Sequence, residues 1–77
     1  MNLTNADKYK WYVVSALDVE DETIKSRFYK LGILPGATVK LKRRAPIFRD
    51  PLLIQVDESQ VALSKQEASY VIIQEIH

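Results

Sequence analysis

The chain has 77 residues, of which 47% are hydrophobic and 27% are charged, and it contains no cysteine. This indicates one small domain, residues 1–77, without general disorder, and it excludes disulfides and thiolate metal sites, as suits the reducing cytoplasm. The formal net charge of +1 gives no bulk attraction to nucleic acid or anionic lipid, and we expect neither a membrane-spanning segment nor a secretory signal.

Residues 1–9 are polar and predict a loosely packed segment with Leu3 as its anchor. The next segment, residues 10–17, is rich in aromatic and β-branched residues and predicts a strand. Its apolar side chains fall on both faces, as in a small closed barrel whose outer face is partly covered. We interpret Trp11 as a lid over one end of the core, and the alternative is a binding aromatic.

Acidic side chains are concentrated before the first helical pattern, in the run Asp18-Val19-Glu20-Asp21-Glu22. Asp18 and Asp21 both suit the N-cap position, and the remaining carboxylates favour the positive end of the helix dipole. The alternative is a hard-cation or metal-sensing site made of the four carboxylates. Because the spacing lacks the glycine and the alternation of a calcium-binding loop, we interpret the run as helix capping.

Ile24, Phe28 and Leu31 recur at helical spacing and predict an amphipathic helix. Lys30 lies on the polar side of this pattern, and Arg27 lies at its flank. We expect the helix to cover the sheet or to close one mouth of a barrel.

A stop signal follows in the six residues Leu31-Gly32-Ile33-Leu34-Pro35-Gly36. Gly32 suits the left-handed position just beyond a helix, where a Cβ would cost energy. Pro35 and Gly36 fit the two central positions of a type II turn. The segment therefore predicts a sharp change from helix to strand, with at least one of Ile33 and Leu34 pinned beneath the turn.

Residues 37–44 predict a half-buried strand, because Val39 and Leu41 alternate with polar residues. Alternation places Lys40, Lys42 and Arg44 on one face. These three cations could form a nucleic-acid surface, but aromatic residues are not interleaved with them and the total charge is close to zero. We interpret the face as solvated, although it could meet an acidic protein partner.

Two prolines interrupt the next segment, Ala45-Pro46-Ile47-Phe48-Arg49-Asp50-Pro51, and predict a loop. Ile47 and Phe48 lie at its tip. They either fold back onto the core or form an exposed apolar knob for a partner, and the pattern leaves both open.

Residues 52–56 and 60–63 predict two strands joined by a turn at residues 57–59. Ser64 and Glu67 form a capping box that starts a short helical turn, and residues 71–76 predict a final strand. The chain is therefore predicted to be mainly β, with one amphipathic helix after the first strand and a short helical turn before the last. Five short strands in so small a chain imply a closed or nearly closed barrel, which removes exposed edges.

The residues favour a protein that is not an enzyme. His77 is the only histidine and stands at the end of the chain, where it is expected to fray. The sequence holds no nucleophile–base pair and no phosphate-binding glycine loop. We predict no catalytic residue, no metal site and no cofactor, beyond weak and transient binding of ferrous iron by carboxylates.

The chain resembles the FeoA family from about Trp11 to Ile76. The resemblance is carried by Arg27-Phe28-Tyr29-Lys30-Leu31-Gly32-Ile33-Leu34-Pro35-Gly36, followed by Ala45-Pro46, Asp50-Pro51, Val61-Ala62-Leu63 and Ala68. Arg49 departs from the pattern, since family members commonly have glycine before the Asp-Pro pair, and it places a bulky cation at the loop tip.

The resemblance implies an SH3-like barrel and a small cytoplasmic accessory of bacterial ferrous iron transport. The implied partner is the membrane transporter FeoB, which carries a G-protein domain. We expect docking through the loop Ala45 to Pro51, with Ile47 and Phe48 as apolar anchors. Arg27 and Lys30 are expected to supply complementary charge. The alternatives are a nucleic-acid-binding barrel, a metal-sensing domain and, for the partner, a second copy of the chain.

Overall fold

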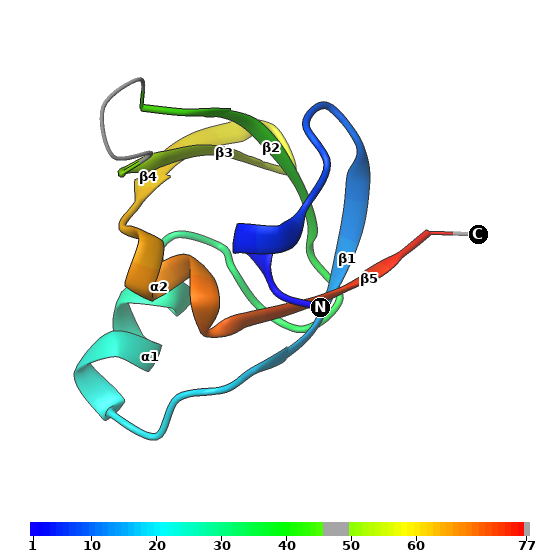
Figure 1. The fold of residues 1–77 in the computed structure, drawn as a ribbon. Helices are drawn as coiled ribbons and strands as arrows, with labels where there is room; N and C mark the ends of the chain where they lie inside the picture. Colours follow the sequence, from blue (N-terminus) through cyan, green and yellow to red (C-terminus); the bar gives the residue numbers. More distant parts are fainter. Residues whose placement is uncertain (46–49, 77) are drawn as a thin grey trace.

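The computed structural model describes residues 1–45 and 50–76. A short 3-10 helix, η1, is followed by five strands and two α-helices (Figure 1). Their bounds are η1 Leu3–Asn5, β1 Trp11–Leu17, α1 Glu22–Lys30, β2 Thr38–Arg44, β3 Leu52–Val56, β4 Ser59–Leu63, α2 Lys65–Ser69 and β5 Val71–Glu75. The predicted mainly β chain, with a helix after the first strand and a helical turn before the last, is confirmed.

The five strands form one antiparallel sheet in the order β4-β3-β2-β1-β5. Figure 1 shows that the sheet curves strongly, and that α2 connects its two edge strands, β4 and β5. The barrel is therefore nearly closed, with α2 in the remaining gap. Along the described residues, no helix is long and apolar enough to cross a membrane.

The core lies inside the curved sheet and follows the alternation of the strands. Tyr12 and Val14 of β1 point into it, as do Leu52, Ile54 and Val56 of β3. Each of these side chains is buried, and each strand presents its intervening residues to the outside. The period of two read from the sequence therefore places the inner face of β3 correctly, whereas both faces of β1 are apolar and its inner face was left open.

Trp11 does not cover the core, so the prediction of a lid is wrong. It is 38% exposed, because Tyr12 and Val14 take the inward positions of β1. Trp11 pairs across the strands with Lys40, whose ammonium lies 4.5 Å from the centroid of the indole ring. The alternative, an aromatic residue available at the surface, agrees with this position.

Helix α1 begins and ends as its sequence predicts. Asp21 is the N-cap, and its Oδ1 accepts hydrogen bonds from the backbone N–H groups of Thr23 at 2.8 Å and Ile24 at 3.2 Å. At the other end, Gly32 has φ of +80°, and the N–H of Ile33 donates to the carbonyl of Phe28 at 2.9 Å. This is the Schellman arrangement, which satisfies the last carbonyls of the helix.

The turn after α1 locks the helix onto the sheet. The N–H of Ala37 donates to the carbonyl of Leu34 at 2.9 Å, and Gly36 has φ of +97°, as a type II turn requires. The N–H of Gly36 also donates to the carbonyl of Val14 in β1. Ile33 is buried and Leu34 is 37% exposed, so one of the two apolar residues is pinned beneath the turn, as predicted.

The N-terminal segment is more tightly held than its polarity predicts. Leu3 is fully buried and anchors the segment, as expected. The carbonyl of Met1 accepts a hydrogen bond from the N–H of Ile73 in β5 at 2.9 Å. The guanidinium of Arg44 donates to the carbonyls of Thr4 and Ala6, at 2.9 and 3.3 Å. The prediction of loose packing is therefore wrong.

A β-bulge in β2 changes the face of its last residue. The pairing with β3 shifts between Leu41 and Arg43, so that Arg44 lies opposite the buried Leu52. Arg44 therefore turns to the inner side, where it reaches the N-terminal segment. The prediction that Lys40, Lys42 and Arg44 share one face is wrong, because the extra residue breaks the alternation.

Candidate functional site

A cleft of about 280 Å³ lies at the base of the predicted docking loop. The loop closes there through a hydrogen bond of 3.0 Å from the N–H of Ala45 to the carbonyl of Pro51. The cleft is lined by Arg43, Ala45, Pro51, Leu52, Leu53 and Ala62. The loop base thus joins an apolar recess formed by β3 and β4.

Asp50 ties this loop base to α2. Its Oδ1 accepts a hydrogen bond of 2.9 Å from the backbone N–H of Lys65, the first residue of the helix. Ser64 is the N-cap of the same helix, and its hydroxyl accepts from the N–H of Glu67 at 3.0 Å. Asp50 therefore accepts from one of the backbone N–H groups that have no partner within the first turn of α2, and it connects the base of the loop to this helix.

Glu67 links α2 to α1. One carboxylate oxygen accepts from the backbone N–H of Ser64 at 2.9 Å, which completes the capping box. The other accepts from Nε of Arg27 at 2.6 Å. The hydrogen bond from Arg27 is the main reason that the pKa of Glu67 lies below its ordinary value of 4.5, and burial of the carboxyl group opposes it. The ion pair thus joins two helices that are distant in sequence.

Replacing Glu67 by glutamine tests this ion pair. Because the pKa of Glu67 is lower in the folded state than in the unfolded state, the stabilisation is complete above about pH 4.5 and is lost as the pH falls through the folded-state pKa. Since glutamine can keep the capping box, we expect Glu67→Gln to lower the free energy of unfolding by about 0.5–1 kcal/mol at pH 7. The difference should vanish at low pH.

Urea denaturation at pH 7 and near pH 3 measures both values. Glu58→Gln, in the exposed hairpin turn, is the matched control for the loss of one negative charge. A penalty for Glu67→Gln that stays constant down to low pH would show that the ion pair does not contribute.

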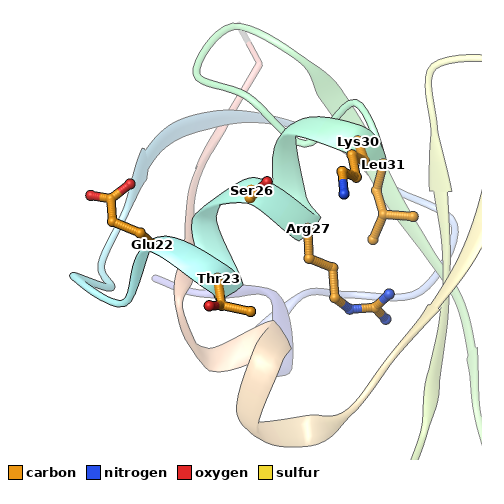
Figure 2. Close-up of a pocket in the computed structure, with 6 residues that line it drawn as sticks. All are labelled: Glu22, Thr23, Ser26, Arg27, Lys30 and Leu31. Atoms are coloured by element: carbon orange, nitrogen blue, oxygen red, sulfur yellow. The ribbon is translucent and has the colours of Figure 1, made fainter.

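Figure 2 shows Arg27 and Lys30 on one side of α1, where a second, open groove of about 710 Å³ follows the helix. The groove is lined by Glu22, Thr23, Ser26, Arg27, Lys30 and Leu31. Lys30 is exposed, whereas Arg27 is already paired with Glu67. The ammonium group of Lys30 is therefore available to a partner. The guanidinium of Arg27 could contact a partner only while it also pairs with Glu67.

The structure brings Arg27 next to the loop base. Its Nη2 donates to the carbonyl of Ala62 at 3.4 Å, and Ala62 also lines the cleft. Ala45, Asp50 and Pro51 lie at the loop base. The other predicted docking residues, Pro46, Ile47, Phe48 and Arg49, lie outside the described residues.

Four residues that line the cleft, Arg43, Leu52, Leu53 and Ala62, were not predicted as site residues from the sequence. Leu53 and Ala62 are a cross-strand pair of β3 and β4, and both lie on the side away from the core. The available signal was Leu53, an apolar residue at an outward position of a strand whose inward positions were already filled by Leu52 and Ile54.

One carboxylate of the acidic run before α1 has the capping role that the sequence predicts. Asp21 caps the helix, and within residues 1–45 and 50–76 no three histidine, cysteine or acidic side chains come together as a metal site would require. Helix capping thus accounts for the position of Asp21 without a bound ion.

Comparisons with protein families and with individual proteins point to the same family. The sequence model of the FeoA domain family matches residues 1–75. A putative Fe(2+) transport protein A of Helicobacter pylori is 36% identical over 97% of this chain and 95% of its own length.

Two solved structures extend the comparison. FeoA of Stenotrophomonas maltophilia, a prokaryotic SH3 domain protein solved in complex with zinc, has a TM-score of 0.82 and 28% identity over 96% of this chain and 89% of its own. Iron(II) transport protein A of Clostridium thermocellum has a TM-score of 0.89 and 21% identity, and it shares the fold over 99% of this chain and 46% of its own. The SH3-like fold that the resemblance implied is confirmed.

Proposed function

The chain belongs to the FeoA family of ferrous iron transport accessory proteins, and on this premise we propose that it acts by binding the membrane transporter FeoB. The family match over residues 1–75 is the observation that carries the proposal. In this function the protein docks on the cytoplasmic part of the transporter and modulates its G-protein domain through protein–protein contacts. It works in the cytoplasm, without a catalytic residue or a resident cofactor.

The roles of the charged side chains support a binding module. Asp21 caps α1, Asp50 holds the start of α2, and Glu67 pairs with Arg27. These carboxylates stabilise helix ends and hold two helices together, which are structural tasks. We therefore assign any contact with ferrous iron to weak and transient binding at surface carboxylates.

The proposed docking surface combines the loop Ala45 to Pro51 with the cleft at its base. Leu53 and Ala62 provide an apolar recess, and Arg27 and Lys30 provide positive charge on the neighbouring helix. Apolar anchors surrounded by charged groups are typical of protein interfaces, in which the anchors supply most of the affinity. Ile47 and Phe48 are the proposed anchors on the loop itself.

Truncating an anchor should weaken docking. We expect Phe48→Ala and Leu53→Ala each to lower the affinity for the purified cytoplasmic domain of FeoB by about tenfold or more, since a desolvated apolar anchor contributes about 1.5–3 kcal/mol. A pull-down followed by titration calorimetry measures the loss.

Leu34→Ala is the matched control, because Leu34 is partly exposed but lies in the turn after α1. It should bind like the wild type, and circular dichroism should confirm that all variants fold. Equal binding by wild type, Phe48→Ala and Leu53→Ala would remove the loop and its cleft from the proposal.

A further inference from the structure

A second surface, which the docking proposal leaves unused, lies where β1 begins. Tyr9 is 67% exposed, and Trp11 is also exposed beneath the ammonium of Lys40. We call this surface the aromatic–basic face, and it consists of Lys8, Tyr9, Trp11, Lys40 and Lys42.

Backbone pairing brings these residues together from two parts of the chain. Trp11 lies opposite Lys40, and Lys8 forms an isolated bridge with Leu41. The N–H of Tyr9 donates to the carbonyl of Leu41 at 2.9 Å. Leu41 points into the core, and Lys40 points outward over Trp11. Lys42, the extra residue of the bulge in β2, follows and is half-buried.

The charges of the molecule are unevenly distributed. Lys10 lies on the other side of β1, over the ring of Tyr12, where it forms an ion pair with Glu75, and Asp7 is the other carboxylate near Lys10. The acidic run of residues 18–22 begins after the opposite end of β1, and Figure 1 shows that the turn before β1 and helix α1 lie at opposite ends of the molecule. The net charge of +1 therefore hides a local cluster of lysines near the start of β1.

We propose that the aromatic–basic face adsorbs to an anionic membrane surface. Tryptophan and tyrosine favour the interface between water and hydrocarbon, and lysine stems can lie along an apolar boundary while their ammonium groups stay among lipid phosphates. Each lysine near an anionic leaflet raises affinity about fivefold. Adsorption of this kind is peripheral and needs no membrane-spanning segment.

The geometry favours a lipid surface over other anionic partners. The aromatic–basic face lies on the outer side of a curved sheet, and neither cleft described above includes any of its residues. An extended surface fits such a face better than a peptide, which needs a groove. A nucleic acid base would need to stack on Trp11, but the ammonium of Lys40 already covers one face of that ring.

Trp11 is the only tryptophan of the chain and reports directly on this contact. With vesicles of phosphatidylcholine and phosphatidylglycerol at low salt, we expect its emission to shift to the blue and to be quenched by brominated lipid. Added salt should reverse both changes, and pure phosphatidylcholine vesicles should cause neither. We expect Lys40→Gln/Lys42→Gln to lower the affinity about 25-fold, since two lysines are lost.

Lys25→Gln/Lys65→Gln removes two lysines from α1 and α2 and should leave vesicle binding unchanged. The proposal is overturned by an unchanged Trp11 spectrum on anionic vesicles, by an equal shift on neutral vesicles, or by equal losses in the two double variants. Tighter binding to a single-stranded oligonucleotide than to vesicles at the same salt would also overturn it. Because the assay contains no transporter, its outcome is independent of the proposed docking on FeoB.

Discussion

Replacing Phe28 by alanine is expected to lower the free energy of unfolding by about 3–5 kcal/mol. Phe28 is the fully buried residue of α1, and the partly buried Ile24 and Leu31 pack against the core as well. A chain of 77 residues has a total stability of about 4–12 kcal/mol, so the change removes a large fraction of it. Urea denaturation followed by circular dichroism measures the loss.

The neighbouring residue provides the control. Tyr29 is 57% exposed on the same helix, and Tyr29→Ala should cost less than about 1 kcal/mol. Similar losses in both variants would show that α1 is not held by its buried face. If Phe28→Ala unfolds the chain at room temperature, Phe28→Leu, which keeps an apolar side chain, should restore most of the stability.

Replacing Leu3 by alanine is expected to cost about 2–5 kcal/mol, because it empties the core position that anchors the N-terminal segment. The segment is also bound through the carbonyl of Met1, which accepts from the N–H of Ile73. We therefore expect faster hydrogen exchange at the Ile73 amide, together with the lower stability. Native-state hydrogen exchange measures the first effect and thermal unfolding measures the second.

Asn5→Ala, at an exposed position of the same 3-10 helix, should leave both measurements almost unchanged. Unchanged protection of the Ile73 amide in Leu3→Ala would mean that backbone hydrogen bonds alone hold the segment. The burial of Leu3 would then contribute little to holding the N-terminal segment against β5.

Features that depend on near neighbours in sequence were predictable. The helix stop at Gly32, the turn at Pro35 and Gly36, and the capping box at Ser64 each need only a few residues, whose allowed backbone angles are known. The inward residues of β3, and Val39 and Leu41 of β2, followed from alternation for the same reason. These local signals were sufficient for the order of elements and for the curved sheet.

Features that depend on distant partners were not predictable in the same way. A one-residue bulge turned Arg44 inward, and its reason lies in the carbonyls of Thr4 and Ala6, which belong to another part of the chain. Trp11 was misplaced because both faces of its strand carry apolar residues, so that composition does not tell which face is inside.

The candidate site shows the same division. Its loop was visible from the two prolines, and Arg27 was recognised as a charged flank of the helix. The pairing of Arg27 with Glu67, 40 positions later, and the approach of Arg27 to Ala62 depend on how α1 packs against α2 and β4. The position of Leu53 in the cleft depends on the pairing of β3 with β4, which the sequence alone does not give.

The hydrogen bond from Arg27 to Ala62 has a consequence for the solubility of the protein. Strand β4 is an edge of the sheet, and its outward backbone groups could template pairing with a strand of another molecule. The guanidinium occupies one of these carbonyls and brings a bulky charge to the edge. An incoming strand would have to displace it, so the same side chain that joins the two helices also protects the protein from edge-to-edge aggregation.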